Sequence, residues 1–298
     1  MRPVRGWRDA LTVIGFLTPA LLLVGAFTLW PTVWAVVQSF TNRALTGIGA
    51  QDPSFVGLAN YQRLLSDSDF FGSLSRTAWF TIASAVIGQT LLGLGVAYLM
   101  AERPGWKLRM TPVLAAVLIL PLAVPETVAA LAWASMANGT EAGLLNRMLG
   151  LANLGPVNWL QDYAMTTVIV VNIWRGLSFA MVLFLAAFEG LPGSVLEASL
   201  VDGATPWQQL RQVMLPMLRR QILMFVLLTV ITTVGIFGLV YFLTRGGPGN
   251  ATELIGIYIY DQAFQFFEIG YGSAAAVIML IILAVGGVYY VKLMREEM

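Results

Sequence analysis

The chain has 298 residues, of which 58% are hydrophobic and 11% charged, and its mean hydropathy is +0.76. A water-soluble domain usually carries about 25% charged residues, so this chain has too few polar side chains to cover a globule in water. The absence of cysteine and histidine excludes disulfide bridges, thiolate or imidazole metal sites and histidine-based nucleophilic triads. The net charge of +1 favours neither nucleic acid nor an acidic partner, and the composition predicts a protein with several membrane spans.

Apolar segments of about 20 residues are needed to cross a hydrocarbon core about 30 Å thick, and the chain offers six. We expect an all-α polytopic membrane protein whose single transmembrane domain covers residues 1–298. The first apolar segment is far longer than that of a signal peptide and has no small-residue cleavage site, so we interpret it as a span. In chain order, the predicted spans cover residues 10–40, 77–101, 110–137, 163–188, 221–244 and 269–291.

The distribution of Lys and Arg predicts the orientation, because the side richer in these residues faces the cytoplasm. Six spans place both termini on one side, together with the 102–109 and 189–220 loops. Five basic residues lie in the opposite loops: Arg43, Arg63, Arg76, Arg147 and Arg245. Eleven lie on the side of the termini, which we therefore expect to be cytoplasmic: Arg2, Arg5, Arg8, Arg103, Lys107, Arg109, Arg211, Arg219, Arg220, Lys292 and Arg295.

The 189–220 loop contains the signals of two short helices. Ser194 and Glu197 have the spacing of a capping box, and Gly203 supplies the left-handed conformation that ends a helix. Thr205 and Gln208 predict a second capping box, with Pro206 at the first helical position. Two capped helices folded back on each other suggest a docking surface; an ordinary structured loop is the alternative.

The same loop carries a longer pattern. Glu197-Ala198-Ser199, then Gly203 after three residues and Val213-Met214-Leu215-Pro216 after nine more, resembles the EAA loop of ABC importer permeases. Ser199 stands where that pattern has Ala, and Val213 where it has Ile. The resemblance implies that the loop seats in a cleft of an ATPase dimer and transmits its movement to the spans. The implied coupling residues are Glu197, Ala198, Ser199, Asp202, Gly203, Leu215 and Pro216.

A narrower resemblance extends from about residue 16 to residue 291. Phe55-Val56-Gly57-Leu58-Ala59-Asn60-Tyr61 and the Gly/Pro-rich stretch from Gly246 to Thr252 are similar to segments of sugar-type permeases of the maltose and glycerol-3-phosphate kind. This resemblance implies one half of a heterodimeric channel in the cytoplasmic (inner) membrane of a prokaryote. The implied substrate is a sugar, a polyol or a glycerol phosphate. The implied partners are a second permease subunit, the ATPase dimer, an extracytoplasmic solute-binding protein and membrane lipid.

The chain has no phosphate-binding loop, since its only lysines are Lys107 and Lys292 and neither stands in the required G-x-x-x-x-G-K-[ST] pattern. We therefore expect it to bind no cofactor, with ATP and magnesium held by the partner ATPase. It is expected to be a transport subunit and not an enzyme.

Two charged residues, Glu126 and Arg175, fall inside predicted spans, where an ionisable side chain is costly and usually faces a cavity or a partner. We predict that they line the substrate path with Asn172, Trp174 and Tyr241, whose amide and aromatic rings suit a sugar. The alternative is a structural Glu126–Arg175 pair that joins the third span to the fourth.

Two other classes of protein remain possible from the residues. An ion-coupled secondary transporter or channel is one alternative, although such carriers commonly show internal repeats and none is apparent here. An intramembrane enzyme that uses Glu126 or Asp162 as an acid or base is the other.

Overall fold

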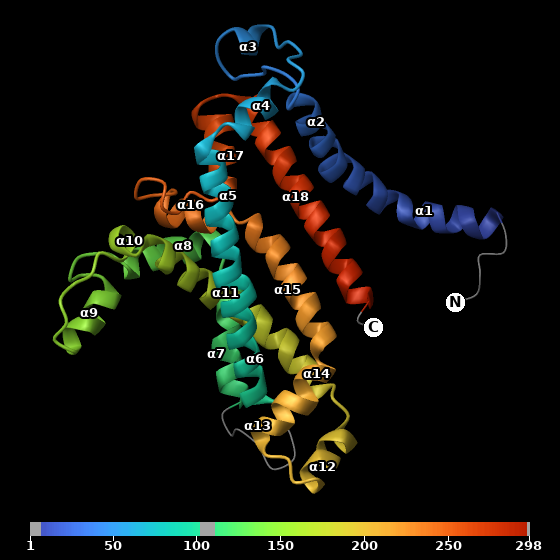
Figure 1. The fold of residues 1–298 in the computed structure, drawn as a ribbon, viewed down its shortest axis with the longest axis vertical. Helices are drawn as coiled ribbons and strands as arrows, with labels where there is room; N and C mark the ends of the chain where they lie inside the picture. The colour runs from blue at the N-terminus through green and yellow to red at the C-terminus, as the bar shows by residue number, and fades with distance from the viewer. Residues whose placement is uncertain (1–6, 102–110, 297–298) are drawn as a thin grey trace. The chain divides into compact units, whose positions relative to one another are not determined.

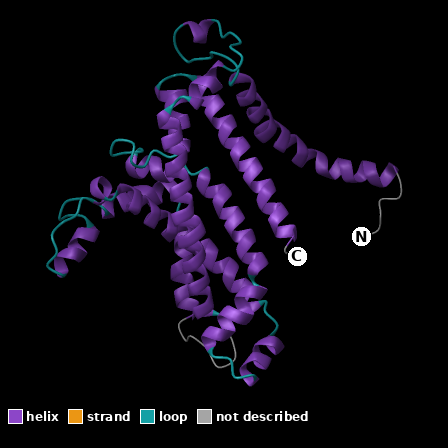
Figure 2. Ribbon diagram, in the orientation of Figure 1, coloured by secondary structure: helices purple, strands orange, loops and turns teal. Residues whose placement is uncertain are grey.

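The computed structural model describes residues 7–101 and 111–296, and in this part of the chain Figure 2 shows helices and loops without a strand. One isolated bridge joins Thr41 to Phe55. The predicted all-helical membrane fold is confirmed. Five of the residues used to predict the orientation lie outside the described residues: Arg2, Arg5, Arg103, Lys107 and Arg109.

The chain divides into two compact units, of which the first comprises Met1–Ser68 and Ile259–Ile282. Its elements include π-helical turns, labelled η, between α-helices (Figure 1). They are α1 (Trp7–Val24), η1 (Gly25–Leu29), α2 (Trp30–Gln38), α3 (Ile48–Gln51), α4 (Ala59–Leu65), η4 (Asp261–Gln265) and the first half of α18 (Ile269–Glu296).

The second unit comprises Asp69–Tyr258 and Leu283–Met298, and it holds most of the helices. Those before the 189–220 segment are α5 (Ser68–Thr81), η2 (Ile82–Gln89), α6 (Thr90–Met100), α7 (Thr111–Ala123), α8 (Glu126–Met136), α9 (Leu144–Leu151), α10 (Trp159–Asp162) and α11 (Ala164–Glu189). Those within and after this segment are α12 (Gly193–Val201), α13 (Pro206–Gln208), η3 (Gln209–Met214), α14 (Leu215–Met217), α15 (Arg219–Val234), α16 (Gly238–Thr244) and α17 (Ile255–Tyr260).

Four described helices are long and apolar enough to cross a membrane: Val13–Gln38, Ser68–Met100, Ala164–Glu189 and Ile269–Lys292. Two further pairs pass the same criterion but are bent: Val113–Ala123 with Glu126–Met136 by 105°, and Pro206–Met217 with Arg219–Val234 by 68°. The described residues therefore contain six spans only if each bent pair crosses once.

The boundaries of the second and fifth spans differ from those predicted. The second begins at Ser68 and continues through Arg76, which the sequence analysis treated as outside the span. Arg76 is tolerated in this helix because its guanidinium lies 3.0 Å from the Glu253 carboxylate. The predicted fifth span, 221–244, is interrupted between α15 and α16 at residues 235–237.

Two clusters of buried apolar side chains form the core of the second unit. One contains Phe80, Val168 and Leu239, and the other contains Phe184 and Phe225, whose ring centroids lie 4.7 Å apart. The helices α6 and α11 approach each other closely where Gly93 faces Ala180, since a Cβ on Gly93 would overlap the alanine methyl. Small residues at such crossings are typical of helix packing in membranes.

In the first unit, the segment that follows Phe55 ties α2 to α4. The Asn60 amide donates to the carbonyl oxygens of Ser39 and Thr41, both at 2.9 Å. The Tyr61 hydroxyl lies 2.6 Å from the Ser39 hydroxyl. These contacts give a structural role to the last two residues of the Phe55–Tyr61 pattern.

Candidate functional site

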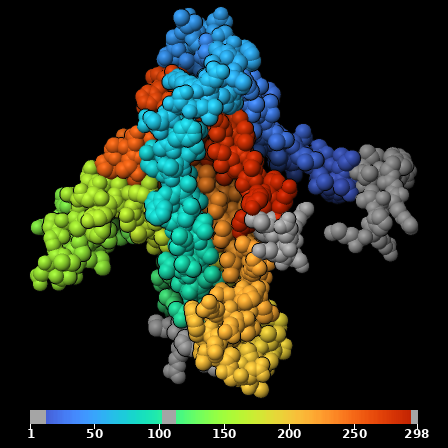
Figure 3. All heavy atoms as spheres, viewed as in Figure 1, coloured from blue at the N-terminus to red at the C-terminus, as the bar shows by residue number. Residues whose placement is uncertain are grey.

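The 189–220 segment packs against the ends of α6 and α11, at one end of the second unit (Figure 1). Leu196 and Met214 are buried in the same cluster as Phe188. The Tyr98 hydroxyl donates to the carbonyl oxygen of Pro206 at 3.2 Å. In Figure 3 the yellow helices of this segment protrude as a knob. The segment is thus anchored on one side and exposed on the other.

Part of the predicted capping is confirmed. The Thr205 side chain and the Gln208 side chain form a capping box at the start of α13, with Pro206 at its first position. Gly203 has a φ of +80° and ends the turn after α12.

The predicted capping box of Ser194 and Glu197 is wrong. The helix α12 begins two residues earlier than that prediction requires, with Pro192 as the N-cap and no side-chain capping bond. Pro192 has the extended conformation (φ −62°, ψ 119°) of an N-cap. Ser194 therefore lies inside the helix, where its backbone is already helical and it cannot act as a cap.

A buried polar link joins the two helices of the knob. The Gln209 side-chain amide donates to the Ser199 hydroxyl at 2.8 Å and to the Leu196 carbonyl oxygen at 3.0 Å. The Ser199 hydroxyl in turn donates to the Leu196 carbonyl at 2.7 Å. The sequence analysis missed Gln209; the polar Ser199 at a position where the EAA pattern has alanine was the signal that could have led to it.

The exposed side of the knob combines acidic and apolar side chains. Glu197, Asp202 and Pro216 are exposed, as are Ala198 and Gly203, whereas Leu215 is half-buried. Val201 is 87% exposed and Trp207 is 65% exposed. Exposed apolar side chains rimmed by charge mark interaction surfaces, and tryptophan is enriched among the residues that contribute most to binding. The sequence analysis did not single out Val201 or Trp207.

A polar cavity of about 330 Å³ lies where η2, α8, α11 and α15 meet. Three of the five predicted path residues line it: Glu126, Asn172 and Arg175. They are joined there by Gln89, Thr229, Thr232 and Thr233, which the sequence analysis missed because they come from distant parts of the chain. Gln89 lies directly over Gly176, where any Cβ would overlap its side-chain amide.

Glu126 connects three helices at this cavity. One carboxylate oxygen accepts a hydrogen bond from the backbone N–H of Leu239, at 2.5 Å, in the first turn of α16. The other lies 3.7 Å from the Arg175 guanidinium. A backbone N–H just after the helix break before α16 therefore has its acceptor in the carboxylate of Glu126 on α8. The same carboxylate lies beside the Arg175 guanidinium of α11.

The other two predicted path residues, Trp174 and Tyr241, are not among the residues that line this cavity. The Trp174 ring lies edge-on to Trp133, with centroids 5.7 Å apart. Tyr241 stacks on Phe237 with centroids 4.9 Å apart. Both rings therefore pack against neighbouring aromatic side chains.

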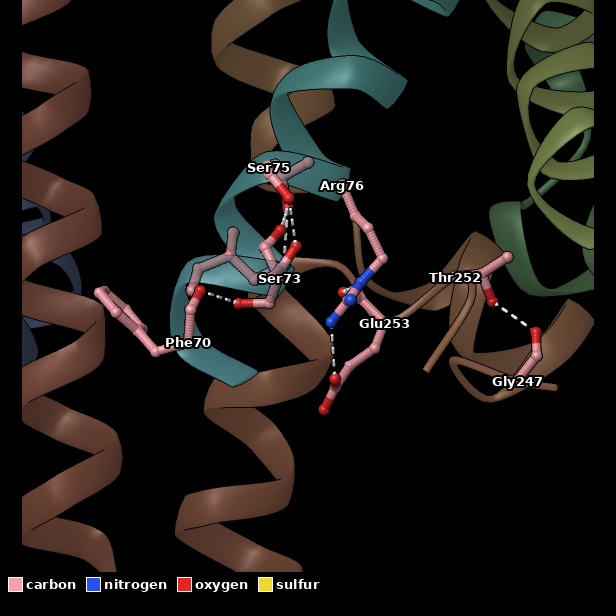
Figure 4. A network of polar contacts seen from close by, with 10 residues as sticks. Phe70, Ser73, Ser75, Arg76, Gly247, Thr252 and Glu253 are labelled. Atoms are coloured by element: carbon pink, nitrogen blue, oxygen red, sulfur yellow. Dashed lines mark hydrogen bonds and ion pairs between the residues drawn. The ribbon is translucent and has the colours of Figure 1, made fainter. Parts of the chain in front are cut away.

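The Gly/Pro-rich stretch after α16 is held against α5. The Arg76 guanidinium donates to both the carboxylate and the carbonyl oxygen of Glu253, each at 3.0 Å (Figure 4). In the same figure, the Thr252 hydroxyl donates to the carbonyl oxygen of Gly247 at 2.9 Å. This stretch is therefore tied to the second span at one end and folded on itself at the other.

The described residues contain no group of three or more acidic side chains that could hold a metal ion. Asp162 ends α10 and does not line the cavity that contains Glu126.

Comparison with known proteins shows which proteins this chain is similar to. A family model described as a binding-protein-dependent transport system inner membrane component matches residues 89–295. The trehalose/maltose transport system permease protein MalF of Thermococcus litoralis is 31% identical over 291 residues, which cover 97% of this chain and 95% of the relative. The sulfoquinovosyl glycerol transport system permease protein SmoG of Agrobacterium fabrum is 30% identical, covering 97% of this chain and 92% of the relative.

Among solved structures, the fold is similar to that of a bacterial ABC transporter involved in the import of the acidic polysaccharide alginate. The TM-score is 0.78 at 20% identity, with 97% of this chain and 96% of the other covered. A chain of the MetNI methionine ABC transporter gives a TM-score of 0.56 at 18% identity, covering 80% of this chain and 99% of the other.

Proposed function

Because this chain belongs to the family of binding-protein-dependent transport system inner membrane components, we propose that it forms one half of the translocation pathway of an ATP-driven importer for a sugar or a related solute. The sugar class is supported by relatives whose names refer to trehalose, maltose and sulfoquinovosyl glycerol. Polyols and glycerol phosphates remain within the proposed class.

The observation that carries the proposal is the knob of the 189–220 segment. Its buried side is fixed to the spans, and its exposed side chains include the apolar Val201 and Trp207 and the acids Glu197 and Asp202. Because the knob is packed against the spans, it can transmit a movement of a bound partner to them. The proposed coupling residues are Glu197, Ala198, Ser199, Asp202, Gly203, Leu215 and Pro216.

The remaining partners follow from the same proposal. ATP and magnesium would be bound by an ATPase dimer that docks on the knob, and an extracytoplasmic solute-binding protein would deliver the solute. The exposed apolar side chains of α1, η1 and α2, such as Phe16, Phe27 and Trp30, would be covered by lipid or by the second permease subunit. Both termini would be cytoplasmic, in the inner membrane of a prokaryote.

The proposed substrate path passes the polar cavity lined by Glu126, Asn172 and Arg175. We keep Trp174 and Tyr241 in the proposed path. Trp174 precedes Arg175 on α11, and Tyr241 lies on α16, the helix whose first turn contacts Glu126. Ionisable side chains inside candidate membrane helices are costly, which favours a functional role for the cavity.

The test is reconstitution of the complete importer in proteoliposomes. Uptake of radiolabelled maltose, trehalose and glycerol 3-phosphate is measured with and without ATP, and the proposal expects ATP-dependent uptake of at least one of them. Uptake that is driven by an ion gradient without ATP would instead support a secondary transporter.

A second arm tests the docking surface by co-purification of the ATPase. Val201→Asp places a charge at the most exposed apolar position of the knob and should abolish co-purification. Trp79→Ala, which truncates a side chain that is 59% exposed on α5 and lies outside the knob, is the control and should retain the ATPase. Equal recovery of the ATPase with both variants would place the docking surface elsewhere.

A further inference from the structure

The polar cavity contains one cation and one anion that oppose each other. Of the described residues that line it, Glu126 and Arg175 are the two that carry a charge, and their nearest charged atoms lie 3.7 Å apart. Their side chains are only about one-third exposed, at 30% and 33%. The formal charge of the cavity wall is therefore zero.

The anion is held in a fixed position. Glu126 accepts the backbone N–H of Leu239 at 2.5 Å through the oxygen that does not face Arg175. The other carboxylate oxygen of Glu126 lies 3.7 Å from the Arg175 guanidinium, so an anionic solute would compete with this carboxylate for Arg175.

The rest of the wall consists of neutral hydrogen-bonding groups and apolar faces. The hydroxyls of Thr229 and Thr232 donate to the carbonyl oxygens of Phe225 and Leu228, one turn earlier, at 3.0 and 3.1 Å. Their oxygen lone pairs are left to accept hydrogen bonds. Gln89 and Asn172 add side-chain amides, while Leu122, Phe179 and Ile236 add apolar surface. This combination of hydrogen-bonding groups and apolar surface suits a sugar, whose ring carries hydroxyl groups and presents C–H faces.

We propose that Glu126 neutralises the cavity and thereby selects uncharged polyhydroxylated solutes over phosphorylated or acidic sugars. This inference rests on the proposed function and narrows its substrate class, since family membership leaves the charge of the solute open. An anion entering a neutral cavity in a membrane loses its water without gaining a free cation, and a buried charge without a partner is costly.

The experiment removes each charge separately and then both. Glu126→Gln removes the negative charge but keeps a side-chain oxygen, so the Leu239 N–H at the helix break retains its hydrogen-bond acceptor. Arg175→Gln removes the positive charge, and the double variant restores a neutral wall. Each variant is assembled into the complete importer with the same binding protein, so a change in selectivity reports on the permease.

Uptake is measured with radiolabelled glucose, maltose and trehalose as neutral probes, and with glucuronate and glucose 6-phosphate as acidic probes. We expect Glu126→Gln to raise the ratio of acidic to neutral uptake by about tenfold or more. Each single variant should slow neutral uptake by about tenfold, and the double variant should recover it to within about threefold of the wild-type rate. Glu253→Gln, which removes a carboxylate paired with Arg76 away from the cavity, should leave the ratio unchanged.

Three results would overturn the inference and leave the proposed function standing. Wild-type uptake of an acidic probe at the rate of the neutral probes would exclude selection by charge. A double variant no faster than the slower single variant would show that Arg175 acts directly on the solute. An unchanged ratio in Glu126→Gln, with the ATPase still bound, would remove Glu126 as the determinant. A wild-type importer that takes up none of the probes with ATP would overturn the proposed function itself, and the inference with it.

Discussion

The link between Ser199 and Gln209 predicts a measurable stabilisation of the knob. Ser199→Ala removes the hydroxyl that accepts from the Gln209 amide at 2.8 Å and donates to the Leu196 carbonyl at 2.7 Å. Gln209 keeps its second acceptor, the Leu196 carbonyl oxygen at 3.0 Å, so its amide nitrogen retains one of its two hydrogen bonds. The expected cost is therefore at least that of a single net hydrogen bond, about 1 kcal/mol.

A double-mutant cycle isolates the pair. Gln209→Leu removes the amide and leaves Ser199 bonded to Leu196, so in that background the same Ser199→Ala change should cost only what the Ser199–Leu196 bond contributes. The coupling energy between the two sites should be about 1 kcal/mol, which is in the range measured for residues in contact. Ser194→Ala, an exposed serine of the same helix, is the matched control and should have no effect.

Hydrogen exchange of the backbone amides of residues 193–218 measures this local free energy without requiring two-state unfolding of the whole complex. A loss of about 1 kcal/mol corresponds to exchange about fivefold faster in Ser199→Ala. If Ser199→Ala speeds exchange equally with and without Gln209, the two side chains act independently and the proposed link contributes no stability.

Three further predictions concern Gly203, the Arg76–Glu253 pair and Asp261. Gly203→Ala should destabilise the knob by about 1 kcal/mol through backbone strain alone, because its φ is +80° and a Cβ there meets no atom within 4 Å. Gly193→Ala, with equal space and an ordinary φ, should not; faster exchange in both variants would exclude strain as the cause. Arg76→Met should lower the free energy of unfolding by about 2 kcal/mol in detergent, since the Arg76–Glu253 side chains are only 24% and 13% exposed. The more exposed pair Arg63–Glu268, at 56% and 39%, should contribute less than about 1 kcal/mol, and an equal loss from Arg63→Met would contradict this ranking. Burial raises the pKa of Asp261 in η4 above 3.8, so its charged form is penalised and its contribution to stability falls as the pH rises through the raised pKa. Asp261→Asn should therefore melt at a higher temperature than the wild type above that pKa and at a similar temperature below pH 3.8, and a constant difference across the pH range would argue against this linkage.

The spans and the helices of the knob could be predicted because their signals are local. Long intervals without charge identify membrane helices, and Thr205, Pro206 and Gln208 act on the first turn of their own helix. The failed prediction at Ser194 shows the limit of this reasoning. The spacing of a capping box was present, but Pro192 already starts the helix and makes the cap redundant.

The breaks in the spans and the composition of the cavity could not be predicted in the same way. The interruption before α16 depends on an acceptor supplied by Glu126, 113 positions away in sequence. Gln89 reaches the cavity only because Gly176 on another helix leaves room for its amide. Such pairings depend on which helices pack together, and that information is not contained in the periodicity of any one segment.

Glu126 illustrates how two alternatives left open by a sequence can both describe one residue. The sequence offered either a path residue or a structural partner of Arg175, and the carboxylate lines the cavity, faces Arg175 and accepts from Leu239. Glu126→Ala would therefore remove a charge, a hydrogen-bond acceptor and cavity wall at once, and its loss of transport could not be assigned. Glu126→Gln retains the acceptor and nearly all of the volume, so a difference between the two variants measures what the Leu239 bond contributes to holding the helix break. If Ala and Gln at position 126 are equally impaired, the negative charge dominates; if only Ala is impaired, the carboxylate acts as a support for α16 and its charge is dispensable.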